Sequence, residues 1–281
     1  MKKLSFSLAA TAVLALTGCE SVTMPASAEM AEAAPEGVDE VLKTWVDARA
    51  GTGEAVHWIA DGGVYEYPSG KKLFGMIGFD SSKVIWPEEE GGPILHLTRK
   101  TFAYTDAETG EILTEYNGQP VEPIAYPYQM ISYRYEDGRI YGDVTQGTGD
   151  RVRDIKSTDG ITATPMGDTW AYTASVWLDF PLPNGNQYQA WENYDFFIHP
   201  EGSVEEPHQM SWQRYGALPS WAGGGQAIYH LLSWRVETLD EFPPELLAWA
   251  KESKPQWLVP PADLAEIEAI QRGDSGTGFS D

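Results

Sequence analysis

Four polar residues in the second half of the chain have types and spacing suited to proton transfer. Glu192 and Asp195 lie on one expected β-strand, Arg214 lies on the next, and His230 lies on the one after that. If these strands are neighbours, His230 can act as base or acid while a carboxylate orients it. Arg214 can hold a substrate carboxylate or stabilise an oxyanion or phenolate. We therefore predict a catalytic set of His230, Arg214, Asp195 and Glu192.

Side chains alternate between the two faces of a strand, so this set divides between faces. Glu192 shares a face with Tyr194, whereas Asp195 shares the other face with Trp191. Either carboxylate could orient the histidine. The residues predicted to contact a substrate are Trp212, Tyr194, Trp191, His57 and Tyr104.

A purely structural interpretation of the same residues stays open. Arg214 can pair with Glu192 or Asp195 as a buried ion pair, and His230 can be a core histidine with its hydrogen bonds satisfied. His57 can be an ordinary edge residue. Most of the 11 tryptophans and 14 tyrosines must be packing residues, although a ligand pocket needs only three or four of them.

The sequence contains none of the familiar cofactor or metal motifs. The five histidines lack the spacing of a local metal site, and the single cysteine excludes both an internal disulfide and a cysteine-based zinc site. No G-x-S-x-G elbow, phosphate loop or dinucleotide fingerprint occurs. We expect no metal and no cofactor.

Positioning these residues requires a β-rich domain. From residue 57 onward, apolar and polar residues alternate with period two, and turn signals such as Asn117-Gly118 and Asp137-Gly138 separate the runs. About ten strands with short turns favour an antiparallel barrel or a highly curved sheet. The strands are expected at residues 57–67, 73–85, 94–105, 111–116, 131–135, 139–144, 161–164, 169–180, 187–199, 209–215 and 227–236.

Helices are expected only at the two ends of this domain. Residues 38–48 have apolar side chains at helical spacing, and residues 246–252 and 260–271 predict two short C-terminal helices after prolines. The fold class is therefore all-β with minor α. One domain is expected over residues 37–272, followed by a flexible tail over 273–281.

The charge balance excludes some partners. Lys and Arg total 19 against 42 Asp and Glu, a net charge of −23. Nucleic-acid binding needs clustered cations, so we expect no nucleic-acid partner. Anionic lipid headgroups should also repel this chain, so membrane attachment would need a covalent anchor.

The N-terminal residues predict such an anchor. Met1-Lys2-Lys3 and the apolar residues 4–16 resemble a signal peptide that is too short to span a bilayer. Leu16-Thr17-Gly18-Cys19 resembles a bacterial lipobox, in which cleavage before the cysteine precedes its acylation. We predict a signal peptide over residues 1–18, lipidated Cys19, and a tether over 19–36. By analogy with proteobacterial lipoproteins, Glu20 favours the outer membrane, facing the periplasm. The alternative is an ordinary signal peptide that is cut near Ala26 or Ala28.

Several motifs, in order, resemble the family named domain of unknown function 1838. They are the segments FGMIGF (74–79), YTDAETGEIL (104–113), ENYDFF (192–197), SWQRYG (211–216), LPSW (218–221), YHL (229–231) and DEFPPEL (240–246). The resemblance implies a lipocalin-like barrel and little about activity. Residues 117–120 and 126–129 depart from the family pattern, so the ligand here can differ from that of other members.

Together these features lead to two functional hypotheses. The first is a cofactor-independent lyase, isomerase or hydratase that acts on a hydrophobic, aromatic small molecule in a barrel cavity. The second is a non-catalytic carrier of a hydrophobic ligand in the cell envelope. A third interpretation is an envelope scaffold whose acidic face binds a partner.

Overall fold

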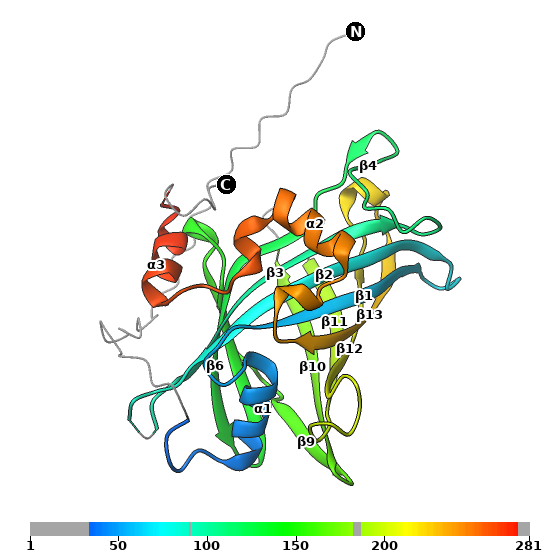
Figure 1. Cartoon of the computed structure of the whole chain (residues 1–281). Helices are drawn as coiled ribbons and strands as arrows, with labels where there is room; N and C mark the ends of the chain where they lie inside the picture. The colour runs from blue at the N-terminus through cyan, green and yellow to red at the C-terminus, as the bar shows by residue number, and fades with distance from the viewer. Residues whose placement is uncertain (1–33, 90, 182–186, 275–281) are drawn as a thin grey trace.

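Antiparallel strands account for most of the chain and close on themselves. The computed structural model describes residues 34–89, 91–181 and 187–274. Ten long or medium strands of this part form a closed barrel, with one helix before it and two helices after it (Figure 1). The predicted barrel with terminal helices is confirmed.

The strands and helices have the following bounds. The strands are β1 (Val56–Glu66), β2 (Lys72–Ile85), β3 (Ile94–Asp106), β4 (Glu115–Tyr116), β5 (Gln119–Pro120), β6 (Ile124–Glu136), β7 (Arg139–Gln146), β8 (Arg153–Ile155), β9 (Ile161–Met166), β10 (Thr169–Pro181), β11 (Gln187–Ile198), β12 (His208–Ala217) and β13 (Gln226–Val236). The α-helices are α1 (Glu40–Ala50), α2 (Pro244–Ser253) and α3 (Leu264–Arg272). Short 3₁₀ turns are η1 (Gly149–Arg151), η2 (Ser220–Ala222), η3 (Leu239–Glu241) and η4 (Pro255–Leu258).

The strand order closes the sheet. It runs β6-β3-β2-β1-β13-β12-β11-β10-β9-β7, and β6 also pairs with β7. The weakest seam is between β7 and β9, where only Arg139 with Thr162 and Ile140 with Ile161 are paired. Closure gives every strand one inner and one outer face and pairs most strand edges, although β10 beyond Thr173 pairs only with β11.

Two dipeptides set hairpin turns as their chemistry predicts. Asn117 and Gly118 have φ of 50° and 74° and join β4 to β5, while Asp137 and Gly138 have φ of 50° and 76° and join β6 to β7. Positive φ at both central positions twists the turn to match the strands, and Asn, Asp and Gly tolerate it best.

Two strand predictions differ from the structure. The strand predicted at residues 111–116 is wrong: this segment leaves the barrel wall, making an isolated bridge at Ile112 and the short strand β4. β6 begins at Ile124 instead of residue 131. Pro127 lies near the start of this strand, and a proline in a sequence argues against a strand. It is accommodated here because the pairing with β3 shifts register at this point. Prolines are tolerated in sheets at such irregular positions.

Helix α1 closes one end of the barrel. Its Trp45 packs edge-on against Phe196, with ring centroids 4.7 Å apart, and also contacts Tyr172 and Tyr133. All three partners belong to barrel strands, so the helix fills this end as a plug (Figure 1). The predicted N-terminal helix therefore supplies part of the barrel core.

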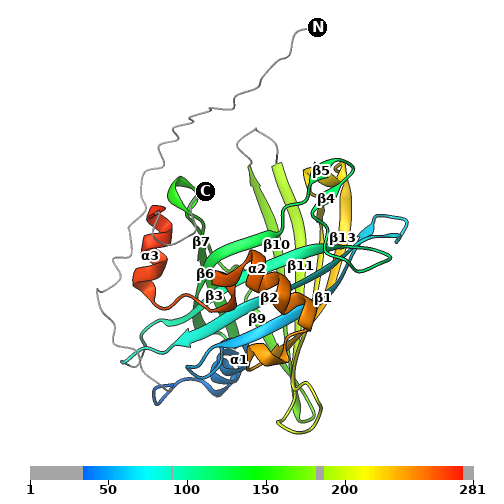
Figure 2. The same cartoon turned by 45° about the horizontal axis from the view of Figure 1, so that its top comes forward.

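The C-terminal helices cover an outer side of the barrel. Apolar residues of α2, η4 and α3 form a core with the outward side chains of β2, β3 and β6 (Figure 2). Arg99 on β3 ties this layer down because its guanidinium donates to the carbonyls of Gln256, Val259 and Pro260 and pairs with Glu266. No helix in the described part of the chain is long and apolar enough to cross a lipid bilayer.

A buried ionic network joins the α1 plug to the barrel wall. Asp80 on β2 points inward and pairs with Arg49 of α1, and it also accepts hydrogen bonds from Ser82 and Thr98. Lys100 on β3 lies 3.6 Å from the same carboxylate. Burial by itself would raise the pKa of Asp80, but Arg49 and Lys100 outweigh it and hold the pKa well below its usual value.

Asp80→Asn is expected to destabilise the domain by about 3–5 kcal/mol, because removing one member of a buried pair leaves the other charges uncompensated. Urea unfolding followed by tryptophan fluorescence measures this loss. The matched control is Lys43→Met, which breaks the exposed pair with Asp47 and should cost less than about 1 kcal/mol. Equal losses in the two variants would contradict the role assigned to Asp80.

Candidate functional site

Strand register decides which predicted site residues meet inside the barrel. Glu192 on β11 lies opposite Arg214 on β12, and Arg214 lies opposite Tyr229 on β13. Tyr194 and Trp212 form the next inward pair. The inner face therefore carries the four predicted residues Glu192, Tyr194, Trp212 and Arg214.

Solvent reaches this part of the interior. The inward side chains of Lys100, Glu192 and Arg214 keep exposed fractions of 21%, 12% and 19%. Tyr126 on β6 is also inward by its pairing with Lys100 and is 37% exposed. Inward side chains of a closed barrel keep exposed surface only where the interior is open. We call the region lined by Lys100, Tyr126, Glu192 and Arg214 the chamber. Helix α1 bounds it at one end.

Arg214 is a cation of the chamber with an unsatisfied hydrogen-bond donor. Its guanidinium lies between the rings of Tyr188 and Tyr229, 5.6 and 5.5 Å from their centroids. The nearest carboxylate oxygen, of Glu192, is 3.7 Å from Nη1, and Nε is buried with no hydrogen-bond partner among the described residues. Two aromatic faces hold the cation in place while its donors stay free for an anion.

The backbone beneath Arg214 is shaped to admit it. A Cβ on Gly216 would lie 2.9 Å from Arg214 Nε and 3.1 Å from the Cβ of Ala190. Real Cβ atoms do not approach other atoms this closely without a shift of the neighbour. The glycine therefore leaves room for the guanidinium along the strand.

Glu192 is a candidate proton donor or acceptor. The hydroxyl of Tyr194 donates to its Oε2 at 2.6 Å. Burial raises the pKa of Glu192 above its usual value, and the hydrogen bond from Tyr194 offsets only part of that effect. A carboxyl group with a raised pKa is suited to general acid–base work near neutral pH.

Tyr104 lies in the chamber wall, but its hydroxyl is already engaged. It donates to the hydroxyl of Tyr229, which donates in turn to the Ala217 carbonyl at 3.0 Å. Burial, then the neighbouring Tyr229, raises the pKa of Tyr104. This pair braces the strands beside Arg214, and Trp221 of η2 covers Tyr104 with ring centroids 4.9 Å apart.

Comparison with known proteins gives a family and nothing more specific. A family described as protein of unknown function, DUF1838, matches residues 53–271. The chain belongs to the DUF1838 family. No curated protein and no solved structure matches it. In this DUF1838 protein, the site must therefore be understood from its own geometry.

Two predicted catalytic residues do not reach the chamber of this DUF1838 protein. His230 lies opposite Gln213 on the outer face, where its Nε2 is 3.3 Å from Ser211 Oγ. Asp195 is also outward and accepts hydrogen bonds from Thr173 and Asn193. The predicted grouping of His230 and Asp195 with Arg214 is not formed, because adjacent residues of a strand point to opposite faces.

Two predicted substrate contacts also lie outside the chamber. Trp191 is on the outer face beside Trp177, which is 75% exposed. His57 is buried on the outer side of β1, bonded to Ser81 and packed edge-on against Phe242. Burial lowers the pKa of His57. Cys19, the predicted lipidation site, lies outside the described residues.

Three chamber residues were absent from the sequence-based site. Lys100, Tyr126 and Tyr188 point inward from β3, β6 and β11. Alternation within the strand at 94–105 places Lys100 on the face of His96 and Tyr104, which was an available signal. Nothing in the sequence showed that this face meets Glu192 across the barrel.

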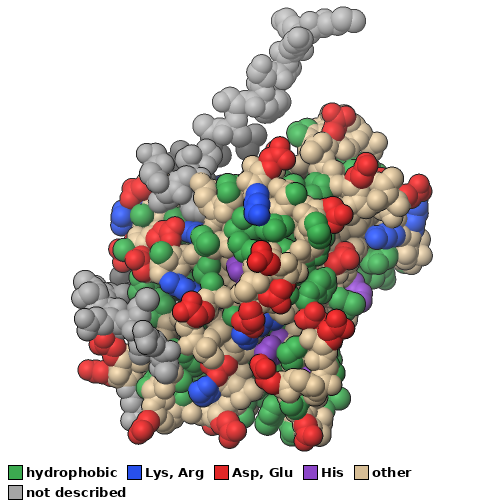
Figure 3. Space-filling view, in the orientation of Figure 1, with side chains coloured by type: hydrophobic (Ala, Val, Ile, Leu, Met, Phe, Trp, Pro, Cys, Tyr) green, Lys and Arg blue, Asp and Glu red, His purple; other side chains and the backbone are tan. Residues whose placement is uncertain are grey.

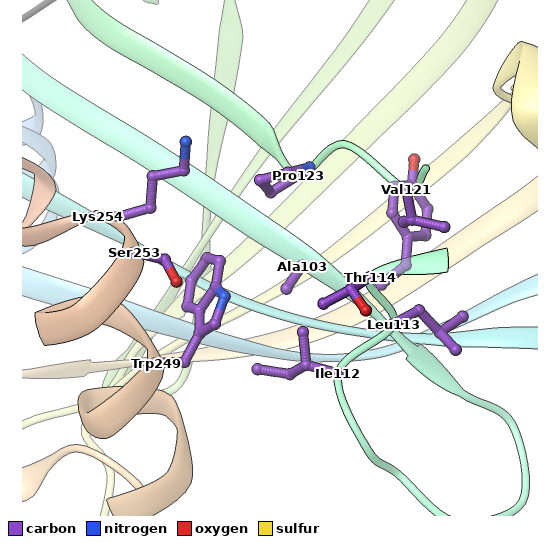
Figure 4. Close-up of a pocket in the computed structure, with 10 residues that line it drawn as sticks. Ala103, Ile112, Leu113, Thr114, Val121, Pro123, Trp249, Ser253 and Lys254 are labelled. Atoms are coloured by element: carbon purple, nitrogen blue, oxygen red, sulfur yellow. The ribbon is translucent and has the colours of Figure 1, made fainter. Parts of the chain in front are cut away.

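A pocket of about 240 Å³ lies against the other side of wall strand β3 (Figure 4). It is on the outer side, between the end of α2 and the connection from β3 to β6. Its lining is mainly apolar, including Ile112, Val121 and Trp249, with Lys254 at its border. Of the predicted site residues, Tyr104 alone contributes to it. No group of three or more His, Cys, Asp or Glu side chains in the described ranges could hold a metal ion.

Replacing Arg214 by methionine tests whether this residue is structural. We expect Arg214→Met to change the free energy of unfolding by less than about 1 kcal/mol, because it removes a buried cation that lacks hydrogen bonds, and Glu192 can become protonated in its absence. Chemical denaturation measures the difference. A loss of about 3 kcal/mol or more would instead identify a structural ion pair with Glu192.

Proposed function

We propose that this protein binds a small aromatic or otherwise apolar anion in the chamber and acts on it as a cofactor-independent enzyme of the lyase, isomerase or hydratase type. Arg214 holds the anionic group, and Glu192 transfers the proton. Aromatic side chains around them, including Tyr188 and Trp212, provide the apolar walls. The competing function is a carrier that binds the same compound and releases it unchanged.

The observation that carries this proposal is the free guanidinium of Arg214. Burying a cation without hydrogen-bond acceptors costs free energy of folding. Proteins retain such a group at sites where a bound ligand supplies the missing acceptors. Its planar, aromatic-flanked donors match a carboxylate, a phenolate or an enolate. A ligand that ends in such a group and has an apolar body suits both features.

Glu192 replaces His230 as the proposed acid–base residue. It has a raised pKa, it faces Arg214, and it belongs to the same inner surface. An anion held at Arg214 would lie beside this carboxyl group, where Glu192 can give or take a proton. His230 is assigned no part in the chemistry because it lies on the other face of the barrel wall.

The charge distribution favours an anionic ligand. The cations Arg49, Lys100, Arg214 and Arg235 lie at inward positions of the barrel or its plug, together with the carboxylates Asp80 and Glu192. The whole chain has a net charge of −23, and acidic side chains outnumber basic ones on the face in Figure 3. Positive charge is thus concentrated where the ligand would bind.

The first experiment incubates the protein with a panel of aromatic and terpenoid acids and follows both binding and product formation by mass spectrometry. Arg214→Met should weaken binding by about 10- to 100-fold, the value of a charge-assisted hydrogen-bonded contact. Glu192→Gln should retain binding and lower turnover by about 10²- to 10⁴-fold, because it keeps the shape and removes the titratable group.

Asp195→Asn is the matched control, since it changes a carboxylate of the same strand on the outer face and should alter neither quantity. Recovery of a tightly bound compound without any conversion would make the protein a carrier. Binding that is unaffected by Arg214→Met would contradict the proposed site itself.

We also propose that the domain is tethered to the bacterial cell envelope through acylated Cys19, most simply at the periplasmic face of the outer membrane. The lipobox-like residues 16–19 and the short apolar segment before them support this proposal. A chain with this acidity gains little attraction from anionic lipid, so the acyl chains would supply the affinity.

Cys19→Ser should abolish incorporation of a fatty-acid label and move the protein out of the membrane fraction, because the acylated thiol is lost. Metabolic labelling with an alkyne fatty acid, followed by fractionation, measures both effects. Ser21→Ala, two residues away, is the control and should leave them unchanged. Equal labelling of the Cys19→Ser protein would exclude this anchor.

A further inference from the structure

Lys100 is a second unusual cation of the chamber. Its strand position places it inward, opposite Asp80 on β2 and Tyr126 on β6. With 21% of its side chain exposed, Lys100 lines the chamber. The proposed function above gives this lysine no task.

The amine is held loosely by its neighbours. Its closest carboxylate oxygen, Asp80 Oδ2, is 3.6 Å away, longer than a hydrogen bond, and already pairs with Arg49. The other oxygen of Asp80 accepts from Ser82 and Thr98. Asp80 therefore orients Lys100. Because an ionised carboxylate only accepts hydrogen bonds, the lone pair of the neutral Lys100 amine stays available.

The surroundings also raise the fraction of Lys100 that is neutral. Burial lowers the pKa of Lys100, and the cation Arg49 lowers it further, while Asp80 and Glu192 oppose them. Lysines that form Schiff bases are activated in this way, by desolvation and a neighbouring cation.

We propose that Lys100 forms an imine with a carbonyl group of the bound ligand, so that the substrate class is an aromatic or apolar oxo acid whose anionic end is held by Arg214. This inference rests on the proposed anion site. It adds a covalent step and a second functional group, an aldehyde or ketone, to the ligand.

The step balances without any further reactant. The lone pair of Lys100 Nζ adds to the carbonyl carbon, and a proton moves from nitrogen to oxygen to give a carbinolamine. Protonated Glu192, acting through water in the chamber, protonates the hydroxyl group, which leaves as water. The remaining nitrogen proton returns to the Glu192 carboxylate as the C=N bond forms. The products are the imine and one water molecule.

The test uses 4-carboxybenzaldehyde with sodium cyanoborohydride on the full-length protein, followed by peptide mapping. Reduction converts the imine to a stable secondary amine. Burial lowers the pKa of both Lys100 and Lys83. We nevertheless expect labelling at Lys100 to exceed that at Lys83 by about tenfold or more, because Arg214 concentrates the probe in the chamber through a charge-assisted hydrogen bond. Lys83 is the internal control, as its amine donates to the Ala262 carbonyl on the outer side.

Two further measurements separate this proposal from the anion site. Benzoate, which has no aldehyde, should compete with the labelling and bind with similar affinity to the wild type and to Lys100→Arg. Benzaldehyde, which has no carboxylate, should label Lys100 less well than the probe. Arg214→Met should remove that difference.

Preferential labelling of Lys100 supports the proposal. This comparison is made within the wild-type protein, so it does not depend on a variant that folds. Equal labelling of Lys100 and Lys83 while benzoate still binds would contradict the proposed imine. It would not contradict the proposed anion site. Failure of benzoate and the probe to bind would overturn both.

Discussion

One buried carboxylate, that of Asp80, joins helix α1 to strands β2 and β3 of the barrel wall. It takes Arg49 from α1, hydrogen bonds from two wall residues and the charge of Lys100, so that the plug, β2 and β3 share one ionic centre. A carboxylate at this depth requires cations around it. Those cations give the barrel interior an excess of positive charge, and Lys100 places part of this charge at the chamber.

The closed barrel then separates two environments. On the face of the outer surface in Figure 3, acidic residues outnumber basic ones, in keeping with the net charge of −23. The inner surface of the barrel is packed around α1 at one end and around Phe74, Met76 and Tyr229 toward the other, while Arg214, Glu192 and Lys100 keep part of their side chains exposed. The residues lining the chamber are held rigidly, because they stand on paired strands whose positions are fixed by the plug and by the C-terminal layer.

Local patterns predicted much of this arrangement. Period-two alternation identified most of the wall strands, and it correctly put Glu192 with Tyr194 and Asp195 with Trp191. It failed where irregularity hid the pattern, at Pro127 in β6 and in the segment after Gly110. Of the predicted site residues, those of β11 and β12 with even numbers, and Tyr104, lie on the inner face of the barrel. His230 did not join them, because the residue of β13 opposite Arg214 is Tyr229.

Short-range chemistry was therefore enough for most of the strands, the Asn117-Gly118 and Asp137-Gly138 turns, the helices at both ends and the family. These features depend on neighbours a few residues apart. Closure of the sheet decided which face became the interior and brought Lys100 of β3 into the electrostatic field of Glu192 on β11. It also let Arg49 reach Asp80. Such contacts arise only when every strand register is satisfied together, and no local pattern of residues encodes that condition.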